Sequence, residues 1–153
     1  MKIRLIAVGK IREPYVASAC ADLRRRLSAY YDYEEIEVKA DRSGVPETAM
    51  REESLRVLKR LGEGDRLWLL DRAGSQLDSE ALAGRLATAR DDGISQLTLA
   101  IGGTFGAGAA LRERADFLWS LSDLTFLHEW ARAIVLEQLY RAAKIARNEP
   151  YHH

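Results

Sequence analysis

The hydrophobic pattern of this chain alternates between the period of a strand and the period of a helix along most of its length. Short apolar runs recur, and between them lie longer stretches in which apolar residues return every three or four positions. This order predicts an α/β fold, a mainly parallel sheet with helices on both faces. We expect strands at residues 3–8, 36–39, 66–70, 97–101 and 117–121, and helices at residues 15–30, 47–61, 79–90 and 129–147.

The length and composition indicate one domain over residues 1–153. A chain of 153 residues, 47% of them hydrophobic, is long enough to bury a core of its own, and no internal boundary is visible. No run approaches the roughly 18 apolar residues of a membrane span, and the apolar N-terminal run is too short for a signal peptide. A single cysteine, Cys20, excludes an internal disulfide and is typical of a cytoplasmic protein. Its place in a predicted helix indicates a packed small residue.

The formal net charge is zero, with 23 basic and 23 acidic residues. A protein that coats nucleic acid nonspecifically needs a basic field, so the composition argues against that class. The first 30 residues nevertheless hold seven basic and two acidic side chains, and Arg24, Arg25 and Arg26 form the densest cluster. Two interpretations stay open, a solvated helix face or a local contact with RNA.

Four glycines, at positions 102, 103, 106 and 108, directly follow the apolar run 97–101. Open α/β sheets bind ligands at the carboxyl ends of their strands, and glycine allows positive φ and close approach of the backbone. The spacing matches neither the G-x-G-x-x-G fingerprint of dinucleotide sites nor a P-loop. The cluster therefore indicates either a ligand-binding turn of another kind or a tight connection between a strand and a helix.

A second unusual segment covers residues 119–128. Residues 122–125, Ser-Asp-Leu-Thr, are typical of a turn or of a helix N-cap, and they also expose backbone groups. Backbone and apolar side chains together suit a ligand with an adenine and an amino-acid part. Trp119 and Phe126 are, by residue type, more often core residues than ligand contacts.

The chain ends in a tail that contains Tyr151 and His152, after Pro150 stops the last helix. Such an end is either a disordered terminus or a source of groups that donate hydrogen bonds, stack on bases or move a proton. The three histidines of the chain lack the spacing of a zinc site, so we expect no metal.

The last predicted helix carries both a polar and an apolar face. Glu137 precedes Arg141 by four residues, the favourable order for a helical ion pair. The apolar stripe looks larger than one small sheet requires, which favours a homodimer. The stripe consists of Val135, Leu136, Leu139, Ala142, Ala143 and Ala146.

With these segments in view, the whole chain resembles the ribosomal large-subunit methyltransferase H family, a minimal member of the SPOUT class. The likeness is strongest in the C-terminal third. It rests on Ile101-Gly102-Gly103-x-x-Gly106, Trp119-Ser120-Leu121-Ser122, His128, Arg132, Leu139-Tyr140-Arg141-Ala142 and Asn148-x-Pro150-Tyr151-His152.

The resemblance implies a trefoil knot at the C-terminus, with S-adenosyl-L-methionine as the cofactor bound in it. It also implies a homodimer that methylates N3 of a pseudouridine in 23S rRNA on the assembled ribosome. The cofactor contacts that it implies are Leu70, Gly102, Leu121, Ser122, Asp123, Leu124, Thr125 and Phe126.

This sequence departs from the family at two places beside the implied pocket. Thr104 and Phe105 stand where the family has Pro-Glu, which removes a carboxylate. Leu127 and Glu129 flank His128 where the family has a proline on each side.

Methyl transfer to N3 requires loss of the N3 proton, and this directs attention to the tail. Tyr151 and His152 are candidate proton acceptors, because the tail is expected near the partner's pocket. Arg132 and Arg141 either hold phosphates and the developing anionic base, or pair with Glu129 and Glu137.

Two other functions stay open from the sequence. One is a noncatalytic RNA-binding or ribosome-associated module that keeps the fold, suggested by the departures from the family. The other is a small α/β nucleotide-binding enzyme of a different class.

Overall fold

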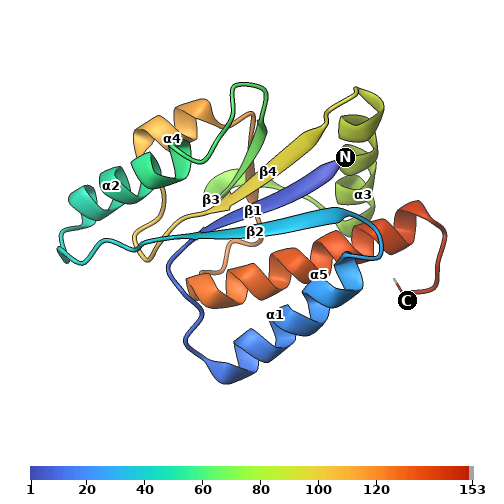
Figure 1. The fold of residues 1–153 in the computed structure, drawn as a ribbon, viewed down its shortest axis with the longest axis horizontal. Coiled ribbons are helices and arrows are strands. Elements are labelled where there is room, and N and C mark those ends of the chain that lie inside the picture. Colours follow the sequence, from blue (N-terminus) through green and yellow to red (C-terminus); the bar gives the residue numbers. More distant parts are fainter. Residues whose placement is uncertain (152–153) are drawn as a thin grey trace.

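The computed structural model describes residues 1–151, so His152 lies outside the described residues. Five parallel strands form one sheet in the order β2-β1-β4-β3-β5 (Figure 1). The expectation of a parallel sheet is therefore confirmed. The strands are β1 (Lys2–Val8), β2 (Asp32–Val38), β3 (Arg66–Gln76), β4 (Gln96–Ile101) and β5 (Phe117–Ser120).

Helices cover both faces of this sheet, as expected. Three pack on one face and two on the other, which gives a three-layer arrangement (Figure 1). The first group is α1 (Pro14–Leu27), α3 (Ser79–Asp91) and α5 (His128–Ala146), and the second is α2 (Pro46–Leu58) and α4 (Ala109–Arg114).

The apolar runs of the sequence become central strands that are buried on both sides. In β1, Leu5 packs into the core beneath α1, α3 and α5, whereas the next residue, Ile6, packs into the core beneath α2. Both side chains are fully buried. Successive side chains of a strand point to opposite faces, so a strand covered on both sides needs apolar residues throughout.

Several elements differ from the expectation. β2 begins at Asp32 rather than 36, because this edge strand carries charged side chains that an apolar criterion passes over. One of them, Glu34, pairs with Lys2 at 2.8 Å. α4 was not predicted, since its six residues are too few to display a helical period. The first helix ends at Leu27, three residues before the expected end.

β3 also continues beyond its expected end at Leu70. Its register with β5 shifts between Leu70 and Ser75, so the residues between them bulge out of the ladder. Gly74 makes this possible, because a Cβ atom there would lie 2.4 Å from the carbonyl oxygen of Leu118. The bulge carries Asp71 and Arg72 to the end of the sheet.

The apolar stripe of α5 packs almost entirely within the core of its own chain. Five of its six residues are buried in the core beneath α1 and α3, and Ala146 is exposed. The argument that surplus apolar surface on this stripe favours a dimer is therefore wrong. The trefoil knot stays a prediction.

Other expectations concern single features of the described chain. Cys20 is fully buried, as a packed residue should be, and burial raises the pKa of its thiol. Within residues 1–151 no helix is long and apolar enough to cross a membrane, and no three metal-ligating side chains gather.

Candidate functional site

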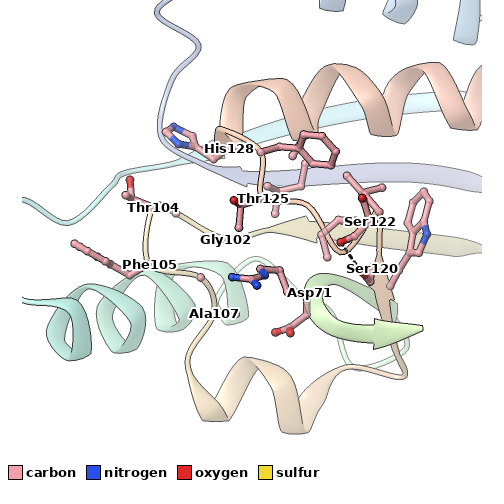
Figure 2. A pocket seen from close by; sticks show the side chains of 18 of the residues that line it. Asp71, Gly102, Thr104, Phe105, Ala107, Ser120, Ser122, Thr125 and His128 are labelled. Atoms are coloured by element: carbon pink, nitrogen blue, oxygen red, sulfur yellow. Dashed lines mark hydrogen bonds between the residues drawn. The ribbon is translucent and has the colours of Figure 1, made fainter. Parts of the chain in front are cut away.

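A cavity of about 330 Å³ opens at the carboxyl ends of β3, β4 and β5, the edge of the sheet where the glycine cluster predicts a site. Its volume is that of a small-molecule site. In Figure 2, Thr104, Phe105 and Ala107 lie on one side of Gly102 and Ser120 and Ser122 lie on the other. The lining comprises residues 70–72, 101–107, 119–122 and 124–126, with Arg112, His128 and Ala131.

The glycine loop after β4 forms the first wall. The Gly106 N–H donates to the carbonyl of Gly103 at 3.0 Å, and Gly106 has a φ of +87°, a value that favours glycine. A Cβ atom on Gly102 would lie 3.0 Å from the carbonyl carbon of Gly106. The loop's own backbone therefore favours glycine at 102, independently of the approach of a ligand.

Helix α2 holds this loop from behind. A Cβ atom on Gly103 would lie 2.3 Å from Oε2 of Glu53, and the Gly108 N–H donates to Oγ of Ser54 at 2.8 Å. Glu53 is buried, and its other oxygen accepts from the Asp41 N–H at 2.9 Å. These contacts fix the wall before any ligand arrives.

The segment after β5 forms the second wall and is a turn rather than a helix cap, because α5 begins later, at His128. Oγ of Ser120 donates to the carbonyl of Ser122 at 3.1 Å, as the dashed line in Figure 2 marks. The Leu124 N–H donates to Oγ of Ser122 at 3.0 Å. Asp123 lies outside the cavity lining, and its Oδ1 accepts from Gln76 at 2.8 Å.

The aromatic residues divide between core and mouth. Trp119 is buried in the core, as its residue type indicates. Phe126, a core residue by type but an implied cofactor contact by the resemblance, is 42% exposed, and Phe105 on the opposite wall is 45% exposed. Both line the cavity. Apolar side chains therefore stand at its mouth and its walls.

One buried carboxylate lies in the cavity wall, that of Asp71. The guanidinium of Arg112 binds it through two hydrogen bonds, Nε to Oδ2 at 2.6 Å and Nη2 to Oδ1 at 2.9 Å. Arg112 is not among the site residues predicted from the sequence, because the short helix that carries it shows no helical period of apolar residues. Asp71 directly follows the expected strand end at Leu70, and a carboxylate at that position is the signal by which the sequence could have indicated this pair.

The tail lies at the other end of α5. The ring of Tyr151 packs on Tyr140 at 4.8 Å and beneath the guanidinium of Arg141 at 4.8 Å. Its hydroxyl donates to Glu137 at 3.3 Å, and Arg141 pairs with the same carboxylate at 2.6 Å, as predicted. Burial, and next the charge of Glu137, raise the pKa of Tyr151. The helical residues that it contacts, Glu137 to Arg141, lie nine to thirteen positions after His128, which corresponds to about 14–20 Å along the axis of α5.

Comparison with known proteins agrees with this fold. The pattern of the family described as "Predicted SPOUT methyltransferase" matches residues 1–152. The chain belongs to this SPOUT methyltransferase family. A protein of Pelobacter propionicus named "Ribosomal RNA large subunit methyltransferase H" is 42% identical over 153 residues, with all of both chains covered. A protein of the same name from Acetivibrio thermocellus is 43% identical over 158 residues, with 99% of each chain covered.

Solved structures of other methyltransferases share the fold at low identity. A probable methyltransferase from Bordetella pertussis Tohama I is 12% identical with a TM-score of 0.55, covering 93% of this chain and 96% of that one. The tRNA (m1G37) methyltransferase of Aquifex aeolicus is 13% identical with a TM-score of 0.54, covering 95% and 70%. A SPOUT methyltransferase fold is thus reached from both the sequence and the structure.

Arg132, a candidate catalytic residue of this SPOUT chain, is buried. Its side chain is 1% exposed and binds Glu37 at 2.7 Å, Glu35 at 3.2 Å and the carbonyl of Gly9 at 2.8 Å. Both Nη atoms of the guanidinium are thus paired, while the buried Nε has no partner within the described residues. A contact of Arg132 with a phosphate or with the target base stays a prediction. The alternative partner Glu129 is wrong, since its carboxylate accepts backbone N–H groups of Arg12 and Glu13.

The three arginines at the end of α1 are paired on the surface. Arg24 binds Glu35 at 3.1 Å, while Arg25 and Arg26 bind Asp22 at 2.6 and 2.7 Å. This agrees with a solvated helix face. A contact of these side chains with RNA stays a prediction.

Proposed function

We propose that this SPOUT methyltransferase transfers a methyl group from S-adenosyl-L-methionine to N3 of a pseudouridine in 23S rRNA of the large ribosomal subunit. The observation that carries the proposal is the cavity itself. Two separate segments, the glycine loop and residues 119–126, build it in a chain about 42% identical to proteins named for methylating this RNA.

The residues of the cavity suit this cofactor. Leu70, Ile101 and Leu121 offer apolar surface for an adenine ring, and the glycine loop presents backbone groups without side chains in the way. When bound, the cofactor supplies a methyl group on a sulfonium, ready for in-line displacement. The chain's own task is then to hold donor and acceptor close and aligned and to exclude water.

The target nitrogen must also lose its proton. In the described arrangement Tyr151 stays a neutral phenol at neutral pH, because its pKa is raised and its hydroxyl faces Glu137. We therefore assign Tyr151 the task of orienting the base through a hydrogen bond. His152, which lies outside the described residues, is the candidate acceptor of the proton.

This chemistry requires a second copy of the chain. The cavity lies at the N-terminal end of α5, whereas Tyr151 packs against the C-terminal half of this helix, beside Tyr140 and Arg141. A twofold axis that pairs two α5 helices antiparallel brings each tail to the partner's cavity. Exposed apolar side chains near the start of α5 supply surface for such a contact, namely Tyr15, Leu127 and Trp130, with the rings of Tyr15 and Trp130 5.7 Å apart.

The substrate form follows from the charge. A chain without net charge gains little from counterion release along RNA, so recognition depends on shape and on a few placed contacts. Arg141 and the cluster Arg24–Arg26 are the proposed contacts. We infer that the assembled ribosome in the cytoplasm, rather than free RNA, is the substrate.

The test is mass spectrometry of rRNA nucleosides after ribosomes, or protein-free rRNA, are incubated with the protein and labelled cofactor. We expect N3-methylpseudouridine, formed faster on ribosomes. Label on another base overturns the target, and equal labelling of free rRNA overturns the preference for ribosomes. Binding of cofactor without any label favours the noncatalytic module.

A further inference from the structure

The pair of Asp71 and Arg112 has no part in the function proposed above, yet it lies in the wall of the cavity. Asp71 is carried there by the bulge of β3, and its side chain is only 3% exposed. Its Oδ1 also accepts from the Ala73 N–H at 2.8 Å. The carboxylate is thus held by the backbone on one side and by the guanidinium on the other.

This pairing fixes the Arg112 side chain but leaves one of its nitrogen atoms without a hydrogen-bond acceptor among the residues that the structure describes. Nε and Nη2 donate to Asp71, whereas Nη1 makes no hydrogen bond within residues 1–151. Its side chain is 48% exposed and lines the cavity. An arginine fixed by a buried carboxylate loses little freedom when it binds a second anion, and its planar group suits a carboxylate.

The second arginine in the cavity wall, Arg72, is not held in place as Arg112 is. Arg72 also lines the cavity, but it is exposed and forms no hydrogen bond or ion pair in the described chain. Without Arg112, the buried charge of Asp71 would repel an anion in the cavity. Arg112 therefore both neutralises this charge and presents free N–H groups beside it.

We propose that Nη1 of Arg112 binds the α-carboxylate of the cofactor's amino-acid part, the one anionic group of that molecule. This assignment rests on the proposed function. Arg112 is then a specificity residue that distinguishes the intact cofactor from nucleosides without a carboxylate. Asp71 is a positioning residue that acts through Arg112.

The experiment measures dissociation constants by calorimetry for S-adenosylhomocysteine and for its decarboxylated analogue, which lacks only the carboxylate. For Arg112→Leu we expect the first constant to rise about 10- to 100-fold, the range of a charge-assisted hydrogen bond. The second should change less than about threefold, since every other contact remains. The analogue thus reports that the cavity is intact.

A matched control is Arg72→Leu, which removes the same charge from the same wall. We expect it to leave the ratio of the two constants nearly unchanged. If Arg112→Leu does not fold because Asp71 is left unpaired, the double variant Asp71→Asn with Arg112→Leu removes both charges and carries the same expectation.

Three results overturn the assignment: an equal loss for both ligands, no loss for either, or a ratio that changes as much in Arg72→Leu. If the unaltered protein binds neither ligand, the proposed function fails as well. An equal loss in the variant with normal binding by the unaltered protein overturns the role of Arg112 alone.

Discussion

Replacing Arg132 by methionine should destabilise the protein strongly. The substitution removes a buried guanidinium that binds Glu37, Glu35 and the carbonyl of Gly9. Breaking a buried ion pair by removal of one partner typically costs about 3–5 kcal/mol, because the other charge is left buried.

The structure places this protein at the lower end of that range. Glu37 is 39% exposed and turns to water when its partner is lost. Glu35 is nearly buried, but it keeps Arg24 at 3.1 Å and the hydroxyl of Tyr33 at 2.9 Å. We therefore expect a loss of about 3 kcal/mol in the free energy of unfolding, or roughly 6–12 °C in melting temperature for a chain of this size.

Urea unfolding followed by tryptophan fluorescence measures this loss, at one fixed protein concentration. The matched control is Arg141→Met on the same helix. Its pair with Glu137 spans one helical turn, and the two side chains are 24% and 26% exposed, so its loss should cost only about 1 kcal/mol.

Two results would refute the reasoning. One is a loss below about 1 kcal/mol for Arg132→Met, which would mean that the buried network contributes little. The other concerns the variant that adds Glu35→Gln to Arg132→Met. This double variant should be at least about 0.5 kcal/mol more stable than the sum of the two single losses predicts, because the uncompensated charge of Glu35 is gone. Additive losses in the free energy of unfolding would contradict this.

The remaining predictions concern the tail, the glycine loop, the buried thiol and assembly. Tyr151→Phe should leave the melting temperature within about 3 °C and sharply reduce methyl transfer to ribosomes, and unchanged turnover would remove Tyr151 from the site. Gly102→Ala should lower both stability, by about 1–3 kcal/mol, and cofactor affinity, because its Cβ meets the Gly106 backbone; calorimetry and urea unfolding decide. Cys20 should react with thiol reagents at pH 8 only as fast as the protein opens, since its pKa is raised, and rapid labelling of the native protein would contradict its burial. Trp130→Asp should convert a dimer into a species of 17.2 kDa by light scattering, and a monomeric unaltered protein would refute the dimer.

The sequence predicts most of the sheet because the central strands are apolar on both faces. It fails where a contact distant in the chain decides the structure. The bulge of β3 exists because Gly74 packs against the backbone of Leu118, and no local pattern reports such an approach. An apolar criterion also misses the start of β2, because this strand carries charged side chains that pair with residues of neighbouring elements.

The same distinction applies to the site. The glycine loop and residues 119–126 are predictable, because glycine and turn residues at the end of a strand have a local meaning. Arg132 is misread from the sequence, since an arginine on a helix is usually at the surface. Its partners Glu35 and Glu37 lie 97 and 95 residues away in the chain, and only the fold brings them under α5. Arg112 is missed because α4 has no period to reveal its face.

The buried ion pairs of Arg132 fix the position of α5 relative to the sheet. His128 and Ala131, at the start of this helix, line the cavity, and Tyr151 packs beside Tyr140 in its C-terminal half. Between them, Arg132 ties the helix to β2 and to the carbonyl of Gly9, where β1 ends. Because the helix is anchored at the same edge of the sheet that forms the cavity, a shift of α5 would change the cavity and displace the tail together. In the antiparallel pair that we propose, each helix would position a cavity wall in its own chain and a tail at the partner's cavity, so the buried ion network would support two half-sites at once.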